Sequence, residues 1–91
     1  MKLEEKEIQE KLNDLKNWSL KNNKLVGKFE FEDFKETFAI MTRIAFEAED
    51  LQHHPEWKNT YNKLEISLTT HDENGITEKD FKLAKFIDKI V

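Results

Sequence analysis

The stretch EDLQHHPEWKNTY, residues 49–61, separates a predicted helix from a predicted β-hairpin. It holds two of the three histidines, His53 and His54, followed directly by the only proline, Pro55. Proline disfavours the α region for the residue before it, so we expect the helix to end here and His54 to be extended. Imidazole exchanges a proton near neutral pH, which makes a histidine pair at such a break a candidate active site.

Before this break, the apolar spacing predicts a helix and then a hairpin. The hairpin covers residues 18–31 and turns at Asn22-Asn23, a pair that tolerates positive φ. Gly27 lies on the apolar parity of this hairpin, where it can leave room for a neighbouring ring. The helix covers residues 2–16, with an apolar stripe of Ile8, Leu12 and Leu15.

The longest predicted helix covers residues 33–52, and its apolar arc is wider than one sheet contact needs. One side of the arc carries Phe34, Phe38, Met41, Ala45 and Ala48. The other side lies about 100° round the axis and carries Ile40, Ile44 and Leu51. Such an arc fits a helix buried within the monomer, or one that also packs on another subunit. We favour the second, through Ile40, Ile44 and Leu51, because a small domain has few elements to cover both sides.

After the break, residues 57–61 and 64–70 predict a second hairpin that turns at Asn62-Lys63. His71 would end its second strand, on the face opposite the aliphatic residues, as a wall for a cleft. That core face carries Leu64, Ile66 and Leu68, and the opposite face carries Glu65, Ser67 and Thr69.

A polar loop over residues 72–75 leads to a last helix, which Thr77 caps, with Glu78 and Asp80 in its first turn. Its expected buried side consists of Phe81, Ala84, Ile87 or Asp88, and Val91, with Leu83 and Phe86 beside them.

The element order α-β-β-α-β-β-α predicts an α+β fold. Its economical packing is a four-stranded antiparallel sheet with the helices gathered on one face. Residues 1–91 form a single domain, because this length leaves no room for a second core.

Composition excludes several classes of function. The chain has no cysteine, which removes disulfides, thiolate zinc sites and thiol nucleophiles and fits a reducing, cytoplasmic setting. The net charge of −4 comes from 15 basic and 19 acidic residues without a basic block, so no direct nucleic-acid partner is expected. The first residues mix both charges, and neither a signal peptide nor a membrane span is predicted.

The three histidines admit several interpretations. Neutral imidazole accepts a proton and imidazolium donates one, so general acid–base work needs no cofactor. His53 and His54 would have different roles, because adjacent side chains in an extended chain point apart. Three histidines can also hold zinc, but the spacing H-H-x16-H matches no common zinc pattern. A Ser-His-Asp triad is not expected, because the sequence has no glycine-flanked serine that could form the nucleophile turn. In the plainest interpretation, each histidine caps a helix end or stacks on Trp57 or Tyr61.

A longer pattern runs through the same residues and resembles the signature of the pterin-4a-carbinolamine dehydratase family. It consists of Glu49, three residues, His53-His54-Pro55, five residues, Tyr61, nine residues, His71, eight residues and Asp80. The run MTRIAFEAEDLQHHPEWKNTYNKLEISLTTH, residues 41–71, is also similar to this family. So is the order of elements over nearly the whole chain.

The resemblance implies an enzyme, a hydro-lyase. It would dehydrate 4a-hydroxytetrahydropterin, the 4a-carbinolamine, to the quinonoid dihydropterin in recycling of the tetrahydrobiopterin-type cofactor of aromatic amino acid hydroxylases. The resemblance implies no metal and no redox cofactor. His53 and His71 would be the catalytic acid and base on the hydroxyl, and His54 would bind or orient the pterin.

The resemblance also implies supporting residues and partners. Glu49 and Asp80 would support the site, and Trp57 would form a wall for the flat ring. The chain would form a homodimer or homotetramer. Some animal members of the family also act as a dimerisation cofactor of a homeodomain transcription factor. A protein-interaction module is therefore the alternative function, with Ile40, Ile44 and Leu51 as its contact residues, and it ranks below the enzyme.

Overall fold

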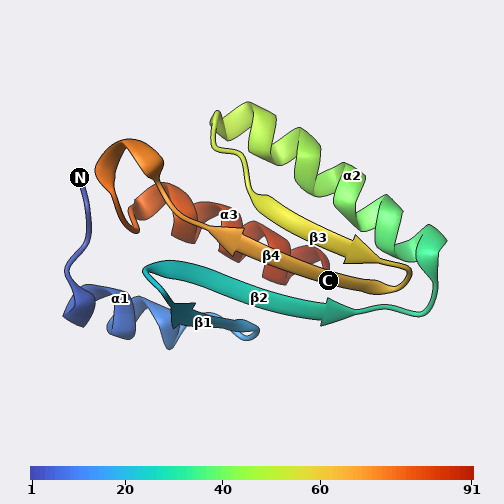
Figure 1. Cartoon of the computed structure of the whole chain (residues 1–91), viewed down its shortest axis with the longest axis horizontal. Coiled ribbons are helices and arrows are strands. Elements are labelled where there is room, and N and C mark those ends of the chain that lie inside the picture. Colours follow the sequence, from blue (N-terminus) through green and yellow to red (C-terminus); the bar gives the residue numbers. More distant parts are fainter.

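A computed structural model describes all 91 residues and has the predicted order of helices and strands (Figure 1). The elements are α1 (Glu5–Leu12), β1 (Trp18–Lys21), β2 (Lys24–Glu30), α2 (Phe34–Leu51), β3 (Glu56–Thr60), β4 (Lys63–Leu68), a 3₁₀ turn (His71–Glu73) and α3 (Glu78–Ile90). None of the helices has the length and apolar character needed to cross a membrane.

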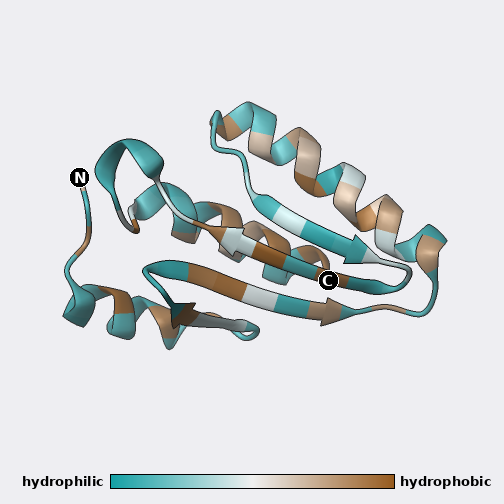
Figure 2. Cartoon of the chain, viewed as in Figure 1, coloured by the Kyte–Doolittle hydropathy of each residue, from teal (hydrophilic) through white to brown (hydrophobic).

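The strands form one antiparallel sheet in the order β1-β2-β4-β3, with the helices on one face, as predicted (Figure 1). Strands β2 and β4 are central, and Leu25 pairs with Leu68 across them. Side chains alternate along each strand, so every second one faces the helices. The side chains between them are mostly polar and face solvent. Brown bands on β2, β4 and the helices mark the apolar residues of this core (Figure 2).

The first hairpin turns where the sequence predicts it. Asn22 and Asn23 both have positive φ, 51° and 63°, in the left-handed region that asparagine tolerates. Gly27 faces Trp18 and Phe29, whose rings meet edge to face with centroids 5.6 Å apart. The predicted role of Gly27 is confirmed, because a Cβ there would lie 2.9 Å from the Phe29 ring.

The second hairpin differs from its prediction at both ends. Its turn is Tyr61-Asn62, because Thr60 pairs with Lys63 and Tyr61 takes the positive φ of 54°. Strand β4 ends at Leu68, so the prediction that His71 ends a strand is wrong. His71 instead begins the 3₁₀ turn.

A backbone bridge is the reason for this early end. Thr70 pairs with Gly75 through hydrogen bonds of 2.8 and 3.3 Å, which close a tight loop between them. Asn74 completes the loop in the left-handed region.

Helix α2 is rotated relative to the prediction. Its buried residues are Thr37, Met41, Ile44 and Ala48. Thr37 can be buried because its hydroxyl donates to the Asp33 carbonyl oxygen at 2.8 Å. Ile44 is fully buried within the monomer, while Ile40 and Leu51 pack partly against the core. Ile44 therefore cannot take part in the predicted subunit contact, whereas Ile40 and Leu51 stay partly exposed. The exposed aromatic residues of this helix are Phe34, Phe38 and Phe46.

Helices α1 and α3 follow their predicted faces with shorter ends. Ile8 is buried, and Leu15 lies beyond the end of α1 but still packs against the core. Val91 is 44% exposed, contrary to the prediction. Near the same end of α3, Asp88 accepts a hydrogen bond of 2.9 Å from the Trp18 indole N–H.

Replacing Gly27 by Ala tests the close packing under β2. The added methyl group would press on the rings of Trp18 and Phe29, and overpacking of this kind costs about 1–3 kcal/mol of unfolding free energy. Urea denaturation measures this cost. Ser19→Ala, at an exposed position of β1, is the control and should change stability by less than about 0.5 kcal/mol. Equal stability of the two variants would contradict this packing.

Candidate active site

The end of α2 sends the two adjacent histidines in different directions. Gln52 adopts the left-handed conformation, and the N–H of His53 donates to the Ala48 carbonyl oxygen at 3.0 Å, which is the 6→1 bond of a Schellman motif. This turn brings His53 inward, where it is 8% exposed. His54 points to solvent with a side chain that is 62% exposed. The prediction that the helix breaks here is confirmed.

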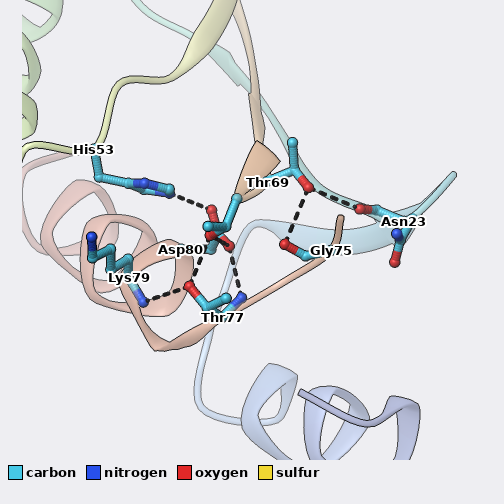
Figure 3. Close-up of polar contacts among 8 residues, drawn as sticks. Asn23, His53, Thr69, Gly75, Thr77, Lys79 and Asp80 are labelled. Carbon is cyan, nitrogen blue, oxygen red and sulfur yellow. Dashed lines mark hydrogen bonds and ion pairs between the residues drawn. The ribbon is translucent and has the colours of Figure 1, made fainter. Parts of the chain in front are cut away.

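His53 contacts the only fully buried carboxylate of the chain, that of Asp80. Asp80 is the third residue of α3, and its Oδ2 accepts the backbone N–H of Thr77, the helix cap, at 2.8 Å. Its Oδ1 lies 2.5 Å from Nε2 of His53, as Figure 3 shows. Oδ2 also accepts the hydroxyl of Thr70 at 2.8 Å. Both oxygens of this carboxylate thus have polar partners from different parts of the chain.

The second ring nitrogen of His53 is left open. No buried side-chain nitrogen or oxygen in the structure lacks a hydrogen-bond partner. Nδ1 of His53 has no protein partner, so it must reach the surface of the molecule. This geometry offers one imidazole nitrogen to a ligand while the other is held by a carboxylate.

His54 and Glu49 form a separate pair. Nε2 of His54 lies 2.8 Å from Oε1 of Glu49, and both side chains are largely exposed. A pair so exposed contributes little stability, since water screens it. Glu49 also borders a shallow, mostly apolar groove together with Trp57, which is half-buried on β3. Residues of α2 form the rest of the groove: Phe38, Met41, Thr42, Ala45 and Phe46.

His71 stands apart from both pairs. Its side chain is exposed and has no hydrogen bond within the protein. His71 directly follows Thr70, and the hydroxyl of Thr70 bonds to Asp80. The backbone of His71 is thus one residue away from a contact with the buried carboxylate. The three histidines do not gather with other ligand-type side chains into a group that could hold a metal ion. The zinc alternative therefore has no ligand set in this structure.

Comparison with known proteins identifies the family of this chain. Residues 1–90 match the family model described as pterin 4 alpha carbinolamine dehydratase. The chain belongs to the pterin-4a-carbinolamine dehydratase family. The predicted resemblance is thereby confirmed.

Individual relatives agree. A protein of Christiangramia forsetii, provisionally named a pterin-4-alpha-carbinolamine dehydratase, is 58% identical over 99% of this chain and 93% of its own length. A provisionally named relative in Solibacter usitatus is 49% identical over 98% and 94%. The crystal structure of a protein described as a transcriptional coactivator/pterin dehydratase, from Brucella melitensis, superposes with a TM-score of 0.97. It is 40% identical and covers 99% of this chain and 98% of its own.

In this dehydratase family member, sequence reasoning missed the hydroxyl of Thr70 that completes the site. Two signals in the sequence point to it. Asp80 lies on the same helical side as Ala84 and Ile87, at the spacing i, i+4, i+7, which indicates a carboxylate that faces the core. A carboxylate in the core needs hydrogen-bond donors, and the hydroxyl of Thr70, 10 residues before Asp80 in the sequence, is one of the nearest.

Replacing Asp80 by Asn tests how strongly the fold depends on these donors. The Asn amide has one accepting oxygen and one donating NH₂ group, so it cannot accept from His53, Thr70 and Thr77 together. Loss of hydrogen bonds to a buried charged group should lower the unfolding free energy by about 1–3 kcal/mol. Urea denaturation measures the loss. Asp14→Asn, at an exposed turn, serves as control and should be nearly neutral. An unaltered midpoint for Asp80→Asn would contradict the network.

Proposed function

We propose that this chain dehydrates 4a-hydroxytetrahydropterin to the quinonoid dihydropterin by histidine acid–base catalysis, in recycling of a tetrahydrobiopterin-type cofactor. The observation that carries the proposal is the contact between His53 and the buried Asp80, which leaves Nδ1 of His53 open at the surface. Family membership supports the reaction class. The proposed enzyme uses no metal and no redox cofactor.

The reaction asks for one proton donor and one proton acceptor. The N5 lone pair of the pterin expels the 4a-hydroxyl when an acid protonates the leaving oxygen, so the C4a–O bond breaks and water departs. A base then removes the N5 proton, which gives the neutral quinonoid product. His53 and His71 are the proposed acid and base, because imidazole can play either part near neutral pH.

The pterin ring needs a binding surface beside these groups. Trp57 is the proposed wall for the flat ring, since its indole is half-buried and presents a flat apolar face. Glu49 is paired with His54. His54 is the proposed binding and orienting residue, held in place by Glu49. Asp80 is the proposed support for His53.

The proposed assembly is a homodimer or homotetramer, and the proposed location is the cytoplasm. Phe34, Phe38 and Phe46 are 45%, 54% and 71% exposed along one helix, α2. Several large apolar side chains exposed together mark an interaction surface. Contact between α2 helices of different subunits would cover them.

A second role in protein interaction remains as the alternative. The similar protein of Brucella melitensis is described as a transcriptional coactivator as well as a pterin dehydratase. The same aromatic surface of α2 would serve such a partner. The enzyme ranks first, because the alternative has no residue-level support comparable with the His53–Asp80 contact.

Replacing the two proposed acid–base histidines tests the reaction. His53→Ala and His71→Ala should each lower the rate of dehydration by about 10²–10⁴-fold, the usual contribution of a general acid or base. Stopped-flow measurement of chemically generated 4a-hydroxytetrahydropterin in the presence of EDTA checks this. His54→Ala is the comparison and should mainly raise KM. Full activity in both His53→Ala and His71→Ala would refute the assignment.

Charge on the exposed face of α2 tests the assembly. Phe38→Lys combined with Phe46→Lys should reduce the mass in solution, because lysine does not fit a buried apolar contact between subunits. Light scattering after gel filtration measures the mass. Lys28→Glu on the solvent-facing side of β2 is the control and should leave the mass unchanged. An oligomer that survives both lysines would contradict an interface at this face.

A further inference from the structure

The hydroxyl of Thr70 sits at the centre of the polar network around Asp80. Its Oγ1 lies 2.8 Å from Oδ2 of Asp80 and 2.8 Å from Oγ1 of Thr77. The Thr77 oxygen in turn accepts the backbone N–H of Lys79 at 3.3 Å, as Figure 3 shows. None of these contacts involves the exposed side chains of the proposed site.

Counting hydrogens gives this network a direction. A hydroxyl has a single hydrogen, and Thr70 donates its own to Asp80. The hydrogen between the two threonines must therefore come from Thr77. Oδ2 of Asp80 then accepts two hydrogen bonds, one from the Thr70 hydroxyl and one from the Thr77 backbone N–H. Oδ1 is the oxygen that contacts His53.

The same count indicates which ring nitrogen of His53 carries a hydrogen. An ionised carboxylate only accepts hydrogen bonds, so Nε2 of His53 must carry a hydrogen toward Oδ1. In the neutral ring, Nδ1 then has the free lone pair. This is the nitrogen that reaches the surface.

Thr70 also closes the loop that carries His71. Its backbone N–H donates to the Gly75 carbonyl oxygen at 2.8 Å, and its carbonyl oxygen accepts from Glu73 at 3.1 Å. These bonds belong to the backbone and would survive a change of side chain. The hydroxyl can thus be removed without opening the loop.

We propose that Thr70 is a positioning residue: its hydroxyl fixes the Asp80 carboxylate, and thereby holds His53 in the tautomer that presents the Nδ1 lone pair to the substrate. This inference rests on the proposed function for its catalytic meaning, whereas the tautomer itself can be measured without substrate. With the hydroxyl gone, Oδ2 loses a donor, and the carboxyl group becomes free to rotate. His53 then samples the other tautomer.

The test compares Thr70→Val, which keeps the shape and removes the hydroxyl, with Thr70→Ser, which restores it. Long-range ¹H–¹⁵N NMR of the histidine rings reports which nitrogen bears the proton. We expect neutral His53 to bear it on Nε2 in the parent chain and in Thr70→Ser, and a mixture of tautomers in Thr70→Val. In a dehydration assay, Thr70→Val should lower kcat about 10-fold with little change in KM, as for other residues that orient functional histidines.

Thr69→Val is the matched control. Its hydroxyl bonds only to the carbonyl oxygens of Asn23 and Gly75, at 3.3 and 3.4 Å, and does not touch Asp80. This variant should leave the His53 tautomer and kcat unchanged. The ring signals of His54 provide an internal reference in every sample.

Three outcomes would overturn the proposal: a parent chain with the proton of neutral His53 on Nδ1, a Thr70→Val variant with unchanged tautomer and kcat, or a Thr70→Ser variant that behaves like Thr70→Val. The parent spectrum and the Thr70→Ser variant still test the proposal if Thr70→Val does not fold. A parent chain with the expected tautomer but no dehydratase activity would refute the proposed function and leave the positioning of His53 intact.

Discussion

The buried carboxylate of Asp80 is the constraint on which the rest of the site depends. A carboxylate removed from water is costly unless donors replace the water. Here they come from three places in the chain: the connection after α2, the residue that starts the loop after β4, and the residue that caps α3. One side chain therefore links the end of one helix, the start of a loop and the first turn of another helix. The same contacts that satisfy Asp80 hold His53 in place.

The Schellman turn at Gln52 gives two adjacent histidines opposite surroundings. His53 turns inward to a buried acceptor, whereas His54 turns outward to an exposed one, Glu49. An imidazole fixed at one nitrogen suits proton transfer at the other, because its orientation is set before the substrate arrives. An exposed, loosely paired imidazole suits binding. The proposed division of work between these residues follows from this difference.

Local chemistry explains which features the sequence predicts. The Asn22-Asn23 turn, the Thr77 cap and the break before Pro55 depend on neighbouring residues alone, and each is confirmed. Strict alternation likewise identifies the buried side of β4. The chemistry of the sequence singled out the three histidines, whereas Glu49, Trp57 and Asp80 were selected by the resemblance to the dehydratase family. Their roles remain proposals.

The errors come from features that depend on the whole fold. The buried face of α2 includes Thr37, whose hydroxyl is satisfied by its own helix, so counting apolar residues rotated the face wrongly. Tyr61 adopts positive φ in a turn where Asn was the expected residue, because the register of β3 and β4 places it there. His71 lies outside its predicted strand because the Thr70–Gly75 bridge closes a loop directly after β4.

The most direct test of the role of Asp80 is a double-mutant cycle on kcat/KM for dehydration, built from Asp80→Asn and His53→Ala. If Asp80 acts through His53, Asp80→Asn will slow the parent enzyme strongly and have little further effect once His53 is gone. An equal loss from Asp80→Asn in both backgrounds would mean that the carboxylate acts independently of His53. That result would contradict the central claim that the buried carboxylate serves catalysis by holding the imidazole.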